Sequence, residues 1–341
     1  MVTCISFASI IEITASPTTA VRSITKQIQL VIVRDGIGTV GRLQDYRFYR
    51  HLFKCCHRKH LHQCVERHVR LQPLPDIPGI EAAGVVEAVG TGVDDFQVGD
   101  RVGYVTAQYG AYASERLLPA DLAIKIPVWL ADMAAASVLV RGLTVQMLTR
   151  IVHRVEPGAN VLVHAAAGGV GRMLCQTLRD IGAHVIGTAG SSEKAAVARS
   201  AGCHEVILYR EEDFVARVRS ITAGRGVDVV YDSVGRDTFK GSLDCLAVRG
   251  HLVNFGQASG PVPPIEMSRL AAGSLTVSRP ILFHYLGDRA ERDAMVATLF
   301  DTTARGVLTV EGVQRFPLAH AGAAQEVLES RRATGPIVLV P

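Results

Sequence analysis

The 341-residue chain has few aromatic side chains and no long apolar run. Phe, Trp and Tyr make up 6% of it, and tryptophan occurs once. No stretch of about 18 uninterrupted apolar residues is present, so we expect no membrane partner. Hydrophobic residues account for 48% and charged residues for 20%, which excludes collagen, coiled coil and disorder. The length suits two domains, each with a core of its own.

Cysteine is too scarce and too irregularly spaced for a disulfide framework. The chain has seven cysteines, and an odd number without a regular spacing is typical of a reducing compartment. The Ser- and Thr-rich segment up to Gln27 has some features of a transit peptide, but it lacks a basic region followed by an apolar core. We therefore expect a cytoplasmic protein.

Basic and metal-ligating side chains are concentrated near the N-terminus. Residues 1–70 hold 11 Lys and Arg against four Asp and Glu, and five histidines and three cysteines fall between His51 and His68. Adjacent Cys55 and Cys56 fit no zinc-ligand spacing, so we predict no metal site there. Basic residues interleaved with aromatic ones are also found in nucleic-acid-binding segments. We expect no nucleic-acid partner; RNA binding by this segment is the alternative.

The middle of the chain alternates between strand and helix patterns. Short β-branched runs predict strands, and segments of 3.6-residue periodicity between them predict helices that begin near Gly171, Ser192, Glu212 and Thr238. The first two helices are expected to end at Gly182 and Gly202, where glycine can form a left-handed cap. The five predicted strands are 161–165, 184–189, 205–209, 228–232 and 251–255. This alternation predicts a doubly wound parallel sheet, the Rossmann arrangement.

The two flanks differ from this pattern. Residues 84–120 contain short strand-like runs separated by glycine turns, which predicts antiparallel β-structure. After Asp288 the pattern predicts a helix to about Arg305, a strand at 314–316, a helix at 321–331 and a strand at 337–340. We predict an α/β protein in which a nucleotide-binding domain, 141–284, is inserted into a β-rich substrate domain formed by 1–140 and 285–341.

A glycine-rich turn follows the first predicted strand of the middle domain. The strand at 161–165 leads into Ala166-Ala-Gly168-Gly-Val-Gly171 and then into a helix. Backbone near Gly168 can approach a pyrophosphate, and Gly171 lets the helix pack closely on the strand. The free amides and the dipole of the helix N-terminus favour the anion. The context predicts a dinucleotide site, with Ala166 in place of the first glycine of the usual motif.

The end of the second predicted strand indicates which dinucleotide is bound. An NAD site usually has an acid at this point, to bind the ribose hydroxyls. Here the segment reads Gly187-Thr-Ala-Gly190-Ser-Ser-Glu-Lys194, with small residues at the strand end and a lysine one helical turn further on. The segment therefore predicts NADPH as the cofactor, with Lys194 beside its 2′-phosphate.

Several separate motifs occur in an order that resembles one known family. The residues from about Pro73 to Pro341, four-fifths of the chain, are similar to the zinc-independent quinone oxidoreductases of the medium-chain dehydrogenase/reductase superfamily. The motifs are Pro78-Gly-Ile-Glu-Ala-Ala-Gly84, Val98-Gly-Asp-Arg-Val102, Gly110-Ala-Tyr-Ala113, Arg141-Gly-Leu-Thr-Val145, His164 to Gly171, Asp232-Ser-Val-Gly235 and Asn254-Phe-Gly256.

This resemblance implies a GroES-like substrate domain and a set of cofactor contacts. It implies that Thr144 lies near the nicotinamide and that the edge strand at 274–278 joins a homodimer. The residues implied to contact NADPH are Ala167, Gly168, Gly169 and Val170 at the pyrophosphate, Gly190, Lys194 and Tyr209 at the 2′-phosphate, Asn254, Phe255 and Gly256 at the nicotinamide ribose, and Arg331 or Arg332 from the C-terminal segment.

The zinc-dependent relatives need ligands that this chain lacks. Their catalytic histidine would stand at Ile80, and no cysteine occurs between Cys64 and Cys175 for a structural zinc site. We therefore predict metal-free, NADPH-dependent reduction of a quinone, with an enone or alkenal reductase as the alternative. Residues 1–71 depart from the family, because Leu61, Glu66 and His68 replace its pocket residues. A cofactor-binding protein with impaired turnover and an RNA-binding N-terminal segment is a further alternative.

Overall fold

The computed structural model describes residues 5–7, 10–14, 77–330, 333 and 335–341. The chain divides into two compact units. Pro127–Gln314 makes up most of the first unit, and the second combines the segment that ends at Ile126 with Arg315–Ala333 and Ile337–Pro341. The domain boundaries expected near residues 140 and 284 stay a prediction.

The first unit is built on a six-stranded sheet whose strands are all parallel. Its spatial order is β12-β11-β10-β7-β8-β9. The strands are β7 (Asn160–Val163), β8 (His184–Ala189), β9 (Glu205–Leu208), β10 (Val227–Asp232), β11 (Leu246–Asn254) and β12 (Thr276–Ser278). Because the chain winds outward in both directions from β7, this is the predicted doubly wound Rossmann arrangement.

Helices connect the strands, and the chemistry of their ends explains where they begin. They are α4 (Gly169–Ile181), α5 (Ser192–Ser200), α6 (Phe214–Ile221), α7 (Phe239–Asp244) and α8 (Ser268–Ala271). Ser191 and Asp213 cap α5 and α6 by accepting backbone N–H groups. Gly182 ends α4 in the left-handed conformation, as predicted. The predicted cap at Gly202 is confirmed too: Gly202 follows the last residues of α5 with a φ of +112°, and the amides of Gly202 and Cys203 donate to the Arg199 and Ala198 carbonyls.

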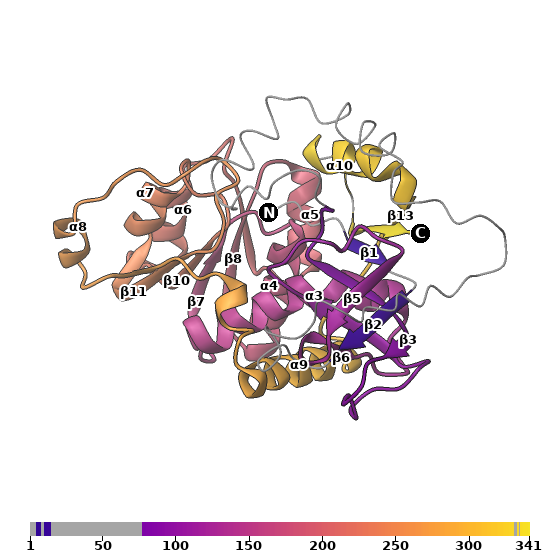
Figure 1. The fold of residues 1–341 in the computed structure, drawn as a ribbon. Helices are drawn as coiled ribbons and strands as arrows, with labels where there is room; N and C mark the ends of the chain where they lie inside the picture. Colours follow the sequence, from indigo (N-terminus) through magenta and orange to yellow (C-terminus); the bar gives the residue numbers. More distant parts are fainter. Residues whose placement is uncertain (1–4, 8–9, 15–76, 331–332, 334) are drawn as a thin grey trace. The chain divides into compact units, whose positions relative to one another are not determined.

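Helices α6 and α7 cover one face of this sheet (Figure 1). Phe239 and Leu243 of α7 and Val218 of α6 pack on strand side chains such as Leu162 and Ile186, and all five are buried. Burial of large aliphatic and aromatic side chains contributes about 1.5–3 kcal/mol each. This core holds the strand ends in place, and the candidate site lies at those ends.

Helix α3 (Asp132–Gln146) and α9 (Arg289–Ala304) pack together in the same unit. The residues Asp132–Val152 are long and apolar enough to cross a membrane, but 78% of their most apolar window is buried inside the protein, as in a core helix. Helix α3 continues into η2 (Met147–Val152), a π-helical turn. The hydroxyl of buried Tyr231 donates to the carbonyl of Leu148 there, at 3.1 Å.

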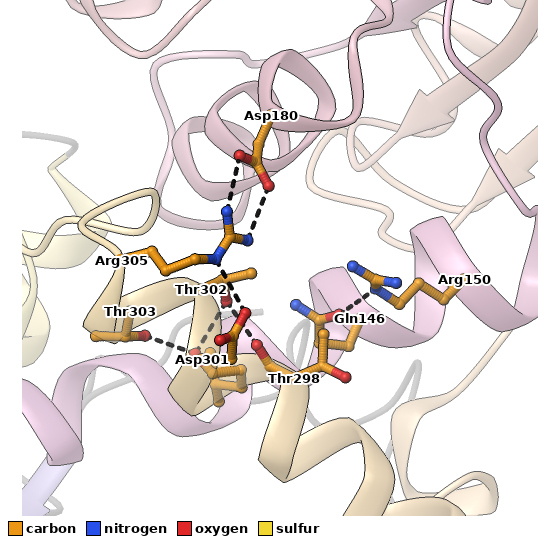
Figure 2. Close-up of polar contacts among 9 residues, drawn as sticks. Gln146, Arg150, Asp180, Thr298, Asp301, Thr302, Thr303 and Arg305 are labelled. Carbon is orange, nitrogen blue, oxygen red and sulfur yellow. Dashed lines mark hydrogen bonds and ion pairs between the residues drawn. The ribbon is translucent and has the colours of Figure 1, made fainter.

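Arg305, just after α9, ties that helix to α4 (Figure 2). Its Nη1 and Nη2 donate to both carboxylate oxygens of Asp180 at 3.2 and 3.0 Å, and its Nε donates to Asp301 at 3.0 Å. The arginine is about half exposed, so the pair fixes geometry more than it adds stability. Figure 2 also shows Arg150 donating to the buried Gln146 where α3 passes into η2.

The second unit contains a mixed sheet; the strand pair within residues 84–120, β3 with β4, is antiparallel as predicted, and the parallel pairs involve strands outside that range. Its path is β13-β14-β1-β3-β2-β5, with β4 and β6 joined beside β3. The β3–β4 and β4–β6 pairs are antiparallel, whereas β1 and β2 run parallel to β3. The strands are β1 (Ile5–Phe7), β2 (Ile10–Thr14), β3 (Glu81–Val89), β4 (Arg101–Val105), β5 (Glu115–Pro119), β6 (Ile124–Lys125), β13 (Gln314–Pro317) and β14 (Ile337–Val340).

The C-terminal segment completes this second sheet, as the sequence predicted. Strand β14 pairs with β1, and α10 (Ala321–Glu329) packs its buried Ala321 and Ala324 against Ile337 and Leu339 of β14. The described helices and strands together form an α/β protein with one parallel and one mixed sheet. The predicted fold class is therefore confirmed.

A pair of histidines near the sheet is expected to make the stability of the fold depend on pH. The Nδ1 atoms of His153 and His251 lie 3.3 Å apart, and Nε2 of His251 lies 2.8 Å from the Ser278 hydroxyl. Burial, with a smaller effect of His153, lowers the pKa of His251 to about 4. The unfolded chain takes up this proton near pH 6.5, whereas the folded chain does not.

The stabilising contribution of the neutral ring is therefore complete above pH 6.5 and is lost as the pH falls toward 4. We expect about 2 kcal/mol of this loss between pH 7 and pH 5. Urea unfolding of the wild type and of His251→Gln at these two pH values measures it. The prediction requires a smaller decrease in the variant; equal decreases would show that His251 does not titrate in this way.

Candidate nucleotide-binding site

The predicted cofactor residues of the first unit come from loops at one edge of the parallel sheet. The loops that follow β7, β8, β9 and β11 supply them. Parallel strands place their carboxyl ends at the same edge, where ligands bind in open α/β sheets. Figure 1 shows β7, β8, β10 and β11 side by side in this unit.

The glycine-rich turn after β7 presents open backbone at the start of α4. Gly168 is the N-cap of α4, and its amide donates to the Ala165 carbonyl at 2.8 Å. Gly168 and Gly169 are exposed, Ala167 and Val170 are partly exposed, and the first turn of α4 carries no acidic residue. Exposed amides at a positive helix end form an anion-binding arrangement.

Gly171 is required by close packing within this turn. A Cβ atom there would collide with the carbonyl oxygen of Ala165 and would lie 3.0 Å from the Ala166 Cα. Both obstacles are backbone atoms, which cannot rotate away as a flexible side chain can. The role that the sequence suggested for Gly171, close approach of the helix to the strand end, is therefore confirmed.

The ends of β8 and β9 form a second part of the site. Tyr209, 47% exposed, follows β9, and its hydroxyl lies so near Gly190 that a Cβ there would be 2.7 Å from Oη. Ser191 caps α5 by accepting the backbone N–H of Lys194 at 3.4 Å, and the Lys194 side chain is exposed in that first turn. The structure thus brings Gly190 and Tyr209 together, with Lys194 four residues from Gly190.

Glu193 is the only acid in this first turn of α5. Hydrogen bonding with Ser191, together with its own backbone, lowers the pKa of Glu193, so the side chain is ionised at neutral pH. It is fully exposed and lies in the helix, not at the strand end where an acid would bind the ribose hydroxyls of NAD. The strand end itself carries only small side chains.

The loops after β10 and β11 are held by a buried carboxylate. Asp232 Oδ1 accepts the amides of Val234 and Gly235 at 2.7 and 3.1 Å and also the Thr238 hydroxyl. Its carbonyl accepts the amides of Phe255 and Gly256. These bonds fix the segment that the sequence placed near the nicotinamide ribose.

Asn254, at the end of β11, is only 2% exposed. Its side-chain amide nitrogen donates to the Gly256 carbonyl at 3.0 Å, whereas its Oδ1 has no hydrogen-bond donor among the described residues. A buried carbonyl oxygen without a donor is a costly feature and is often completed by a ligand or water. Asn254 is therefore suited to accept a hydrogen bond from a bound molecule.

Thr144 lies in the last turn of α3 and is partly buried. Its hydroxyl donates its single proton to the Val140 carbonyl at 2.7 Å. The oxygen therefore remains available only as an acceptor. The place of Thr144 near the nicotinamide stays a prediction.

The structure also identifies two arginines that the sequence did not single out. The guanidinium of buried Arg141, on α3, lies against Gly169, where a Cβ atom would be 3.0 Å from its Nε. Arg279, just after β12, donates to the Asn254 carbonyl at 3.1 Å. Each lies 25 or more residues from its contact, so no local motif could have revealed them. The Arg141 side chain therefore leaves little room for a side chain at position 169, independently of any ligand.

Some predicted features lie outside the described residues. These are Arg331 and Arg332, the His and Cys cluster between 51 and 68, and the departure from the family at Leu61, Glu66 and His68. Within the ranges that the structure describes, no three His, Cys, Asp or Glu side chains are grouped so that they could hold a metal ion.

Two family models match the chain. The alcohol dehydrogenase GroES-like domain matches residues 51–128, and the model described as zinc-binding dehydrogenase matches residues 169–300. The quinone oxidoreductase of Salmonella typhimurium is 47% identical over 277 residues, which cover 80% of this chain and 85% of that protein. This chain is a quinone oxidoreductase family member.

Two further similarities support the same family assignment. The 2-haloacrylate reductase of a Burkholderia species is 46% identical over 271 residues, covering 78% of this chain and 81% of that protein. The crystal structure of the Escherichia coli quinone oxidoreductase complexed with NADPH superposes with a TM-score of 0.77 at 45% identity. It covers 80% of this chain and 84% of that chain. The predicted family is confirmed.

Proposed function

We propose that this protein is an NADPH-dependent quinone reductase that needs no metal ion. The observation that carries the proposal is the carboxyl edge of β7, β8 and β9. The exposed N-terminus of α4, the contact between Gly190 and Tyr209, and Lys194 all follow strands that end at this edge. The relatives that share at least 45% identity include quinone oxidoreductases, and one of these was crystallised with NADPH.

The residues present fit this cofactor on two counts. A Cβ atom at Gly168 would lie 3.1 Å from the Ala165 carbonyl oxygen, and one at Gly190 would lie 2.7 Å from the Tyr209 hydroxyl, so both positions favour glycine. In the proposal, Ala167 to Val170 hold the pyrophosphate through backbone amides. Gly190, Lys194 and Tyr209 hold the 2′-phosphate, with Lys194 as the cation. Asn254, Phe255 and Gly256 border the nicotinamide ribose, and Arg331 or Arg332 contributes from the C-terminal segment.

Bound NADPH would supply the hydride, so the protein's own task is to bind, orient and exclude water. Thr144 is proposed to border the nicotinamide, where its hydroxyl oxygen is left as an acceptor by the bond to Val140. The segment at Phe255 is held by the Asp232 carbonyl, which gives the ring a rigid wall. Solvent or a nearby hydroxyl supplies the one proton that completes the hydroquinone after hydride transfer.

The proposal is tested by steady-state assays of the full chain with NADPH and a panel of quinones. We expect quinone reduction that is faster with NADPH than with NADH and unchanged by a chelator, because no residue in the site is assigned to a metal. Activity that disappears with chelator and returns with zinc would contradict the proposal, as would inactivity with every quinone.

An enone or alkenal reductase is the second candidate. The similarity to a 2-haloacrylate reductase favours it specifically, because that relative is as close as the quinone oxidoreductases. The same cofactor site serves both reactions, since each places an electron-poor acceptor beside the nicotinamide. Including enones and 2-haloacrylates in the panel separates the two functions.

We further propose a cytoplasmic homodimer with no nucleic-acid partner. In the first unit, β12 is an edge strand of the parallel sheet, and a second copy could pair along it. The domain limits at 1–140, 141–284 and 285–341 belong to the same proposal. RNA binding by the N-terminal segment is the alternative, and it falls outside the described residues.

A further inference from the structure

His164, beneath the glycine-rich turn, is completely engaged by two side chains from different elements. It follows β7 and is 1% exposed. Its Nδ1 lies 3.1 Å from the hydroxyl of Thr188 on β8, and its Nε2 lies 3.0 Å from the hydroxyl of Ser242 on α7. Its ring meets Phe214 edge to face, with the centroids 5.1 Å apart. These contacts permit one orientation of the ring.

The hydrogen bonds around this ring also determine where each proton lies. The Ser242 hydroxyl donates its only proton to the Thr238 carbonyl at 2.9 Å, so it must accept from Nε2–H of His164. Burial, opposed by the charge of Asp232, lowers the pKa of His164, and the ring is neutral. A neutral ring protonated at Nε2 has a lone pair at Nδ1, which accepts the Thr188 hydroxyl proton.

The chain of bonds ends on the backbone of the cofactor turn. Because the Thr188 hydroxyl donates to His164, its lone pairs face the amide of Ala165, which donates to it at 3.3 Å. Ala165 has a φ of +53°, a left-handed conformation that costs a non-glycine residue about 1–2 kcal/mol. Its carbonyl accepts the Gly168 amide and is the atom on which α4 packs at Gly171. Thr188 therefore holds the strained residue from which the turn is built.

We propose that His164 is a positioning residue for the proposed NADPH site, acting through Thr188 to fix the peptide at Ala165 and thereby aim the amides of Gly169 and Val170 at the pyrophosphate. His164 does not touch the cofactor in this role. At its other end, the Ser242–Thr238 contact leads to Asp232, which fixes the loops after β10 and β11. One buried histidine thus links the two halves of the site. The proposal rests on the proposed function.

The test compares Thr188→Val with Thr188→Ser in the full-length protein. Valine has the shape of threonine without the hydroxyl, and serine keeps the hydroxyl. Two ligands are titrated by calorimetry: NADPH, which needs the glycine-rich turn, and 2′-AMP, which carries the 2′-phosphate but no pyrophosphate. We expect Thr188→Val to weaken NADPH binding about tenfold, the effect of one lost hydrogen bond. Binding of 2′-AMP should be unchanged, and Thr188→Ser should restore NADPH affinity to within about threefold.

Each outcome bears on the proposal. Equal loss of affinity for both ligands would show that His164 is merely structural, and unchanged NADPH affinity in Thr188→Val would also overturn its positioning role. If Thr188→Val does not fold, Ser242→Ala removes the acceptor on the opposite side of His164 and must give the same selective loss. Failure of the wild type to bind NADPH would instead reject the proposed function itself.

Discussion

Gly171→Ala is expected to weaken NADPH binding at least tenfold and to lower the free energy of unfolding by about 1–3 kcal/mol. The added methyl group meets the Ala165 carbonyl oxygen and the Ala166 Cα, and neither can move without shifting the turn itself. The turn and the N-terminus of α4 must therefore separate, which displaces the amides of Gly169 and Val170. Calorimetric titration with NADPH and urea unfolding measure the two effects.

Gly287→Ala is the matched control for this substitution. Gly287 has nothing within 4 Å of the added Cβ and does not have a positive φ, so the same change meets neither an obstacle nor backbone strain. We expect its NADPH affinity and stability to match those of the wild type. Equal NADPH affinities of Gly171→Ala and Gly287→Ala would show that the glycine-rich turn does not hold the cofactor.

Lys194→Ala is expected to lower kcat/KM for NADPH about 10- to 100-fold and to leave the value for NADH unchanged. A hydrogen bond between charged groups contributes about 1.5–3 kcal/mol, which corresponds to this range. Only NADPH carries the 2′-phosphate, so loss of the lysine removes an attraction that NADH never had. Glu193, the neighbouring residue, is ionised, so loss of the lysine also leaves the first turn of α5 with a net negative charge.

Arg199→Ala provides the control for the change in charge. Arg199 is exposed in the last turn of α5, at the opposite end of the helix that carries Lys194 in its first turn. The Arg199→Ala substitution removes one positive charge from the same helix, at a position outside the proposed cofactor site. We expect both cofactors to behave as with the wild type. A parallel loss for NADH and NADPH in Lys194→Ala would mean that Lys194 does not select the phosphate.

The sequence predicted most of the parallel sheet because its central strands β7, β8 and β10 are short, mostly buried runs between turn signals. Strands β8 and β14 have the predicted bounds, and the others differ by a few residues; β11 begins five residues before its predicted start. The helix starts were also recovered, since Ser191 and Asp213 are strong cap residues. Gly202 was recovered as a cap as well, because its positive φ lets the amides of Gly202 and Cys203 bond back to the Arg199 and Ala198 carbonyls at the end of α5.

Local sequence patterns could not predict contacts between segments that are far apart in the chain. The parallel pairing of β1 and β2 with β3 joins segments about 75 residues apart, and local alternation does not distinguish parallel from antiparallel partners. Likewise, Arg141 against Gly169 and His164 between Thr188 and Ser242 result from packing across elements. The motif residues indicated the chemistry of the site, whereas the supporting residues emerge only from the fold.

The central claim is that the first unit binds a phosphorylated nicotinamide dinucleotide through backbone amides and one lysine, without a metal ion. Calorimetric titration of the chelator-treated wild type with NADPH, and in parallel with NADH, tests it most directly. The account predicts saturable binding of one NADPH per chain, tighter than that of NADH. An absence of binding heat, or binding of NADPH only after zinc is added, would contradict it.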